Sequence, residues 1–125
     1  MGQRYLLDTN VILDFMGRKL PIKSMALLSK IIDDQIKISA ISKMELLGFT
    51  NVEQNVVDFV CFMEIYHIDD EIIDKTIELR KKYKIKLPDA IIAATAIVNN
   101  FILISHNTKD FQKIIELHWV DSYDV

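Results

Sequence analysis

Short apolar segments alternate with longer segments of helical periodicity along this chain, and no other feature restricts its fold as strongly. The apolar segments predict strands at Arg4–Leu7, Ile36–Ala40, Ile65–Ile68, Ile102–Ser105 and His118–Val120. The periodic segments predict helices at Val11–Met16, Ile22–Asp34, Ser42–Phe49, Val52–Met63, Asp70–Tyr83, Leu87–Asn99 and Phe111–Glu116. Strands that alternate with helices favour an α/β sandwich with a mainly parallel sheet.

The composition agrees with one globular domain that spans residues 1–125. Half of the residues are hydrophobic and 26% are charged, which suits a soluble fold. No apolar run is long enough to span a membrane. The net charge of −3 disfavours a domain held on nucleic acid by bulk positive charge. Cys61 is the only cysteine, so no internal disulfide can form and a reducing cytoplasm is the expected location.

Acidic and amide side chains follow two of the predicted strands at the point where each strand ends. Asp8 comes directly after the first strand, and Asn107 and Asp110 follow the strand Ile102–Ser105. Sites in parallel α/β sheets lie at the carboxyl ends of the strands. We therefore expect these side chains to converge at one edge of the sheet.

Two of the candidate acids have an alternative role as helix caps. Asp8 or Asn10 could cap the helix that follows, because Asp and Asn are preferred at that position. Ser42 and Glu45 match a capping box, in which Glu45 would reach back to the start of the helix. The capping box is the better local interpretation, but Glu45 also lies in an apolar stretch, which makes it a candidate for an inward-facing ligand.

Asp89 and Asp110 also have ordinary alternatives. Asp89 follows Pro88 and precedes a run of small residues, so it could simply favour the dipole in the first turn of a helix. The small residues predict close packing, which would hold Asp89 on a rigid, buried element. Asp110 on its own is an ordinary loop or N-cap residue, and its interest comes from the other three acids.

The chemical argument for these acids is collective. Carboxylates brought together repel one another, so some must bind a proton or a cation must bind among them. Hard cations such as Mg²⁺ or Mn²⁺ prefer oxygen ligands. A metal held in this way can activate water and neutralise charge that develops on a phosphodiester. The sequence alone does not show that the four residues meet.

Four segments, in order, resemble the motifs of PIN domains: Leu6–Asp14, Ser42–Leu47, Lys86–Ala96 and Ile104–Phe111. The compact length resembles the VapC toxins of bacterial VapBC toxin–antitoxin pairs. The resemblance implies a three-layer PIN-like sandwich with a metal-dependent endoribonuclease site that binds Mg²⁺ or Mn²⁺. It also implies an RNA substrate, a small antitoxin partner and a homodimer.

The same resemblance implies roles for individual residues. By motif position, Asp8 and Asp89 would be the principal metal ligands, and Glu45 would bind directly or through water. We assign the fourth acidic role to Asp110. Thr9 would help to shape the site, and Asn107 could offer a further oxygen.

A basic run precedes Asp89, and it predicts a contact with RNA phosphates. Its members are Arg80, Lys81, Lys82, Lys84 and Lys86. The alternative is a solvated helix end, where lysines favour the dipole. The alternative for the whole protein is a catalytically weak or inactive PIN-fold module that binds RNA or protein.

The remaining aromatic and histidine side chains carry simpler expectations. The core is expected to contain Tyr5, Phe15, Phe49, Phe59 and Phe62. The three histidines, His67, His106 and His118, lack metal-ligand spacing and are expected to be surface or packing residues.

Overall fold

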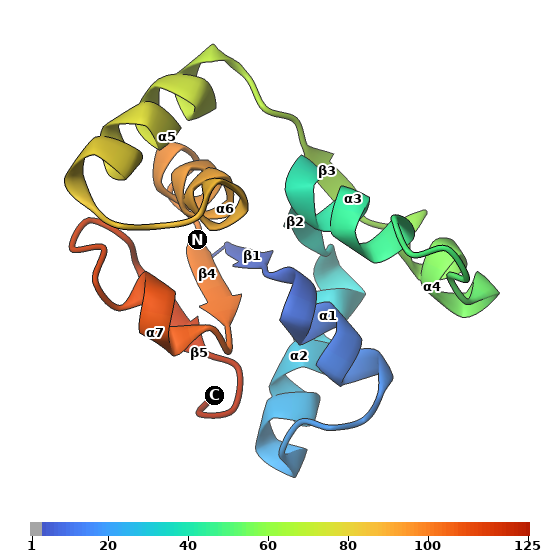
Figure 1. The fold of residues 1–125 in the computed structure, drawn as a ribbon. Coiled ribbons are helices and arrows are strands. Elements are labelled where there is room, and N and C mark those ends of the chain that lie inside the picture. Colours follow the sequence, from blue (N-terminus) through green and yellow to red (C-terminus); the bar gives the residue numbers. More distant parts are fainter. Residues whose placement is uncertain (1–3) are drawn as a thin grey trace.

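The computed structural model describes residues 4–125, and Figure 1 shows its fold. The strands are β1 (Tyr5–Leu7), β2 (Lys37–Ser39), β3 (Glu64–Tyr66), β4 (Ile102–Ser105) and β5 (Trp119–Asp121). The helices are α1 (Thr9–Met16), α2 (Ile22–Asp34), α3 (Ala40–Leu47), α4 (Gln54–Val60), α5 (Asp70–Lys82), α6 (Leu87–Val98) and α7 (Thr108–Phe111). The predicted alternation of strands and helices is confirmed.

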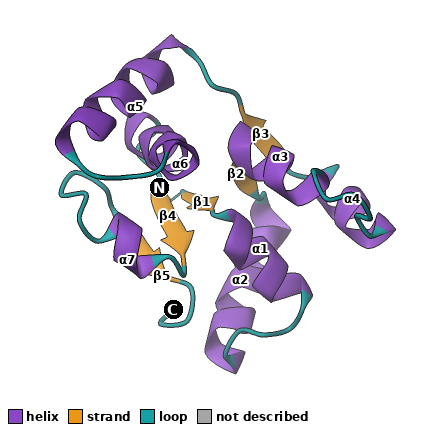
Figure 2. Ribbon diagram, viewed as in Figure 1, coloured by secondary structure: helices purple, strands orange, loops and turns teal. Residues whose placement is uncertain are grey.

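Every strand pairing in the described part of the chain is parallel. β4 pairs with β1 on one side and with β5 on the other, and β2 pairs with β3. β1 also lies against β2, so the two hydrogen-bonded ladders are neighbours at the centre of the fold (Figure 2). The parallel central sheet is confirmed, with its hydrogen bonding divided into these two parts.

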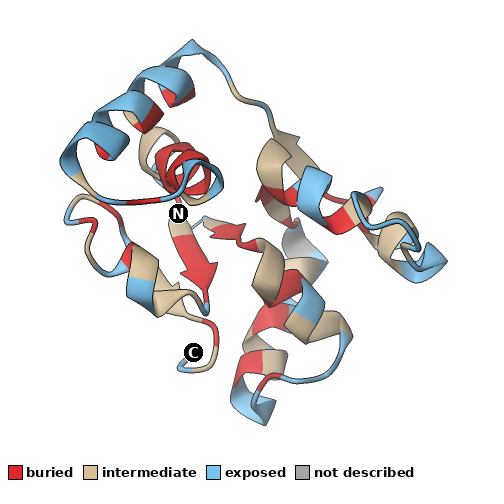
Figure 3. Cartoon of the chain, viewed as in Figure 1, coloured by how far each residue is buried: buried red, intermediate tan, exposed pale blue. Residues whose placement is uncertain are grey.

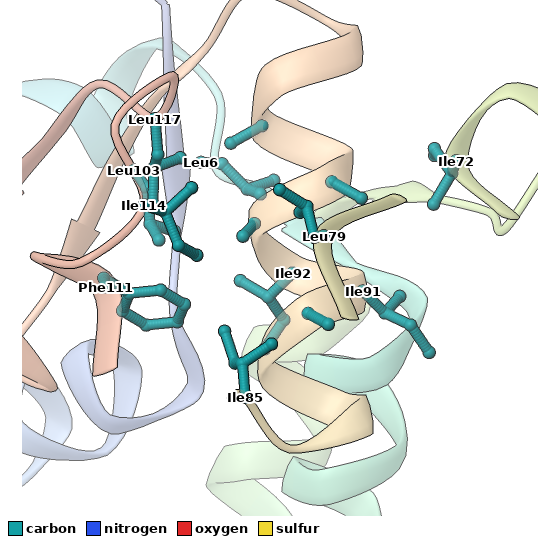
Figure 4. Packing of buried hydrophobic residues seen from close by; sticks show 14 of the residues in the cluster. Leu6, Ile72, Leu79, Ile85, Ile91, Ile92, Leu103, Phe111, Ile114 and Leu117 are labelled. Atoms are coloured by element: carbon teal, nitrogen blue, oxygen red, sulfur yellow. The ribbon is translucent and has the colours of Figure 1, made fainter. Parts of the chain in front are cut away.

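Alternation along the central strands divides the core into two layers. Successive side chains of a strand point to opposite faces of the sheet. Leu6 and its neighbour Leu103 pack on one face with α5, α6 and α7 (Figure 4). Leu7 and its neighbour Ile104 pack on the other face with α1 and α2. The β1–β4 pair therefore supports helices on both sides.

Helix α6 is buried over most of its length. Seven consecutive residues, Ala90–Ala96, are buried, and α6 is largely red in Figure 3. Four of them are alanines, whose small side chains let α5 and the sheet approach closely. Pro88 lies in the first turn, where its missing N–H costs no hydrogen bond. The predicted rigid, buried element is confirmed.

Helix α3 begins earlier than its sequence pattern suggested. Its N-cap is Ser39, whose Oγ accepts a hydrogen bond from the Ile41 amide at 3.1 Å. Ser42 instead lies inside the helix and is buried. The capping-box interpretation of Ser42 and Glu45 is therefore wrong. Two serines stand near the start of this helix, and the one that directly ends the strand takes the cap.

The predicted helix Phe111–Glu116 is also wrong. Helix α7 ends at Phe111, and successive turns follow, with hydrogen bonds from Ile114 N to Phe111 O and from Leu117 N to Ile114 O. Phe111, Ile114 and Leu117 are all buried. Their spacing of three residues resembles a helix, but each is placed in the core by a separate turn.

Two predicted core aromatics lie at the surface. Phe49 is 58% exposed and Phe62 is 80% exposed, whereas Phe15 and Phe59 are partly buried and stack on each other. The segment Val52–Met63 forms only the short helix α4, too short to bury its apolar residues on all sides. No helix among residues 4–125 is long and apolar enough to cross a membrane.

Candidate active site

Asp8 lies at the junction of β1 and α1 and is buried. Its Oδ1 accepts a hydrogen bond from the Thr9 amide at 2.8 Å, so the predicted capping role is confirmed. Its Oδ2 accepts from Ser105 Oγ at 2.7 Å and from Asn10 Nδ2 at 3.3 Å. Burial raises the pKa of Asp8, hydrogen bonds from Ser105 and Thr9 oppose the increase, and the nearby Glu45 charge adds to it. Capping uses one lone pair of Oδ1 and leaves another available.

Ser105 connects the two strand ends that carry the site. It is fully buried at the end of β4. While its hydroxyl donates to Asp8, its oxygen accepts the backbone N–H of Asn107 at 2.9 Å. Ser105 therefore fixes both the carboxyl of Asp8 and the turn that leads toward Asp110. The sequence did not single it out, although a serine that ends an apolar strand is a usable signal.

Glu45 reaches the same edge from helix α3. Its Oε1 accepts a hydrogen bond from Thr9 Oγ1. Ser42 Oγ lies 3.0 Å from Thr9 Oγ1, and because the Thr9 proton goes to Glu45, the Ser42 hydroxyl is the donor to Thr9. Glu45 is an exposed residue, so its carboxylate stays accessible from solvent. The structure therefore brings Glu45 to Thr9, but the expected inward-facing position is wrong, because Glu45 lies on the exposed face of α3.

Asp89 lies in the first turn of α6 and is partly buried. Burial, followed by the charges of Asp8, Asp110 and Glu45, raises the pKa of Asp89 to about 6, while Lys86 acts in the opposite direction. Such mutual effects require the four acids to be near one another. We refer to Asp8, Glu45, Asp89 and Asp110 as the acidic site.

Asp110 is held by two side chains of its own neighbourhood. Its Oδ2 accepts from Asn107 Nδ2 at 3.0 Å, and its Oδ1 lies 3.8 Å from Lys113 Nζ. Lys113 Nζ also donates to the Lys84 carbonyl at 2.6 Å. Lys113 thereby joins the loop before Asp89 to the segment that carries Asp110. Asp110 has more neighbouring donors than Asp89 and fewer lone pairs free for a ligand.

The donor chemistry of the acidic site fits a hard divalent cation. Carboxylate oxygens are the preferred ligands of Mg²⁺ and Mn²⁺. In the observed side-chain conformations, no group of three or more His, Cys, Asp or Glu residues within residues 4–125 is arranged to hold an ion. Mg²⁺ does not need such a cage, because it is usually bound through one or two carboxylates and keeps several waters.

The basic run covers the last turn of α5 and the loop before α6, and its exposed members differ in their surroundings. Lys82 lies 3.8 Å from Glu116, and Arg80 Nε donates to the Ile85 carbonyl at 3.3 Å. Lys86 is the member whose charge acts on Asp89. Arg80 and Lys82 thus have intramolecular partners, whereas Lys86 is near the acidic site.

These features define a class of protein: an α/β fold in which a parallel sheet and its following helices gather acidic side chains at one edge. The model of the PIN domain family matches residues 5–117. Ribonuclease VapC1 of Haemophilus influenzae strain R2866 is 30% identical over 129 residues, which cover 94% of this chain and 96% of that protein. The chain therefore belongs to the PIN domain family.

Solved structures of related complexes have the same fold. VapBC2 of Rickettsia felis, bound to a DNA fragment from its promoter, has a TM-score of 0.79 at 26% identity, covering 95% of this chain and 98% of that one. A toxin–antitoxin complex of Klebsiella pneumoniae has a TM-score of 0.74 at 32% identity, covering 97% and 99%. VapBC-1 of nontypeable Haemophilus influenzae has a TM-score of 0.78 at 27% identity, covering 96% and 98%.

Proposed function

We propose that this protein is a divalent-metal-dependent endoribonuclease and the toxin of a toxin–antitoxin pair. The observation that carries the proposal is the acidic site, in which the pKa of Asp89 rises to about 6 beside three other acids. The similarity to ribonuclease VapC1 over nearly the whole chain supports RNA as the substrate. Residues 1–125 form one PIN domain in this proposal.

Asp8 and Asp89 are the principal ligands for Mg²⁺ or Mn²⁺ in this proposal, with Glu45 as a third, direct or water-mediated. The bound ion would neutralise charge on a phosphodiester and make water a better nucleophile. Thr9 keeps Glu45 in place by donating to its carboxylate, and Ser105 keeps Asp8 in place. Asp110 completes the negative edge, and the hydrogen bond that Asn107 donates to it favours a supporting role for both.

The test is cleavage of an end-labelled single-stranded RNA in Mg²⁺, in Mn²⁺ and in EDTA. We expect cleavage with either metal and none in EDTA. Asp8→Asn and Asp89→Asn should each lose cleavage, while Asp58→Asn on the exposed face of α4 should retain it. All variants come from one host and one purification, so a contaminating nuclease would appear equally in each. Cleavage that persists in Asp8→Asn would refute the proposal.

Lys86 is the strongest candidate for a phosphate contact in the basic run. It is exposed, precedes α6 directly and is near Asp89. Lys84 and Lys81 extend the positive charge around it. Arg80 and Lys82 contribute less, because each already has a partner within the chain.

An antitoxin partner is proposed for the apolar surface around α1 and α4. This surface comprises Phe15, Met16, Phe59 and Phe62, and it continues into a hollow of about 310 Å³ that includes Leu13 and Phe49. Apolar side chains that gather at the surface in this way, some exposed and some partly buried, mark interaction sites. The complexes from Rickettsia felis and Klebsiella pneumoniae contain both toxin and antitoxin, so a small antitoxin is the proposed occupant. Phe62→Ser should then weaken co-purification with a co-expressed antitoxin and leave RNA cleavage unchanged.

We further propose a homodimer in the cytoplasm. The exposed, single cysteine Cys61 is compatible with a reducing compartment.

The alternative function, an inactive PIN-fold binding module, predicts no carboxylate-dependent metal site. A Mn²⁺ titration followed by calorimetry separates the two, because only the nuclease requires a site that disappears in Asp8→Asn.

A further inference from the structure

His106, expected from the sequence to be only a surface or packing residue, is connected to the acidic site through Asn10. It follows Ser105, and its backbone N–H donates to Asn10 Oδ1 at 3.2 Å. Asn10 in turn reaches Asp8 Oδ2 with its amide nitrogen at 3.3 Å. A single side chain therefore connects the His106 backbone to the most buried carboxyl of the site.

The ring of His106 is held in one orientation. Its Nδ1 lies 2.8 Å from Asp121 Oδ1, and its face stacks on Tyr123 with a centroid distance of 3.9 Å. Asp121 is itself fixed by accepting the Tyr123 amide at 3.0 Å, and Tyr123 OH donates to Asp14 at 3.3 Å. The His106 side chain nevertheless remains 47% exposed. The ring is thus both ordered and accessible.

The hydrogen bond to Asp121 determines what the other ring nitrogen offers. An ionised carboxylate only accepts, so Nδ1 carries the proton. Nε2 has no hydrogen-bond partner among residues 4–125. In the neutral ring, Nε2 is then an accessible acceptor on a residue whose backbone contacts Asn10, the neighbour of Asp8. The only donor that an RNA backbone offers independently of sequence is the ribose 2′-hydroxyl, which is also the group that distinguishes RNA from DNA.

We propose that His106 Nε2 accepts a hydrogen bond from a ribose 2′-hydroxyl of an RNA strand bound at the acidic site. Asp121 and Tyr123 are positioning residues that hold the ring for this contact. This inference rests on the proposed function, because it takes RNA as the ligand. It adds a residue that selects the sugar, separate from the acids that act on the phosphate.

The test measures binding by fluorescence anisotropy in an Asp89→Asn background, at about pH 8, with Mg²⁺ present. Two labelled strands of the same sequence are compared, one of RNA and one of DNA. His106→Asn keeps a donor for Asp121 but lacks an atom at the Nε2 position, whereas His106→Gln keeps an acceptor there. His118→Asn, at an exposed histidine directly before β5, is the matched control.

We expect His106→Asn to weaken RNA binding by roughly fivefold, the effect of one hydrogen bond, and to leave DNA binding unchanged. His106→Gln should restore much of the RNA affinity, and His118→Asn should change neither affinity. Equal losses for RNA and DNA, or no loss for either, would overturn the inference. Failure of the parent protein to bind RNA at all would instead count against the proposed function.

Discussion

At the level of single residues, Asp89 links ionisation to stability. Its pKa of about 6 lies above the ordinary 3.8, so the folded protein binds this proton more tightly than the unfolded chain. The free energy of unfolding should therefore fall as pH rises between these two values. Because Asp89 loses this proton as pH rises, we expect the metal-free protein to melt at a lower temperature at about pH 7.5 than at about pH 5. Asp89→Asn, which resembles the protonated acid, should flatten that part of the profile.

Circular dichroism melting in EDTA checks this prediction at both pH values. Glu71→Gln, an exposed acid in the first turn of α5, is the control. Adding Mg²⁺ should raise the melting temperature of the parent protein and not that of Asp89→Asn. An unchanged pH profile in Asp89→Asn would show that another group carries the dependence.

Ser105 gives a second prediction at the residue scale. Ser105→Ala leaves the buried Asp8 carboxyl without one donor and the Asn107 amide without its acceptor. Loss of a partner to a buried polar group costs about 1–3 kcal/mol. Urea unfolding should show this loss, while Ser105→Thr keeps the hydroxyl and should recover most of it. Ser29→Ala on the exposed face of α2 should change stability by less than about 0.5 kcal/mol. A change of that small size in Ser105→Ala would contradict the assigned role.

The sequence was sufficient to predict where the acids lie when their position follows from topology. It was not sufficient to predict the serines that hydrogen-bond around them. Asp8 follows a strand, and Asp89 begins a helix of small residues, so both could be expected at a buried edge. The supporting serines, Ser42 and Ser105, depend on which side chain faces them across 33 and 97 residues. No local pattern contains that information.

At the level of elements, α3 has two serines with separable functions. Ser39→Ala removes the N-cap, which costs about 0.5–2 kcal/mol, and should speed hydrogen exchange of the Ile41 amide that it binds. Ser42→Ala should leave that amide protected and instead loosen Thr9, which supports Glu45. Exchange measured by NMR distinguishes the two variants. Unchanged Ile41 exchange in Ser39→Ala, together with faster Glu45 exchange in Ser42→Ala, would return the cap to Ser42.

Element boundaries were predictable where the chain has clear stop signals. The helix Ile22–Asp34 and the strand Ile102–Ser105 agree with the structure at both ends. The predicted helix after Asn107 failed because apolar residues spaced three apart fit consecutive turns as well as a helix. Apolar spacing shows which residues are buried, but tertiary contacts decide the backbone path between them.

At the level of the whole molecule, the net charge of −3 limits how strongly RNA can be held by electrostatics. Each phosphate contact on a single strand contributes about 0.7 to the slope of log affinity against log salt. We expect a shallow slope of about 1–2, and Lys86→Ala should lower it by about 0.7. Lys30→Ala on the exposed face of α2 is the control. Anisotropy titrations at several salt concentrations measure the slope. An equal change of slope in both variants would show that Lys86 does not contact RNA.

The fold class was predictable at this scale because alternation of strands and helices is a property of the whole chain. The split of the sheet into two ladders was not, since it depends on how β1 lies against β2. The exposed apolar surface was also missed. Phe49 and Phe62 are of a residue type that is usually buried in a core, but both lie exposed at the surface.

The burial of α6 has a consequence for how such a protein can change over generations. Residues 90–96 are enclosed, so most substitutions there destroy the fold. Asp89 lies one residue earlier and is only partly buried, so its replacement can leave the fold intact. A single codon change at this position can therefore produce a folded but inactive protein. That protein still presents Phe15, Phe59 and Phe62 on the same surface. Such a protein would compete with an active one for the antitoxin that we propose to bind this surface.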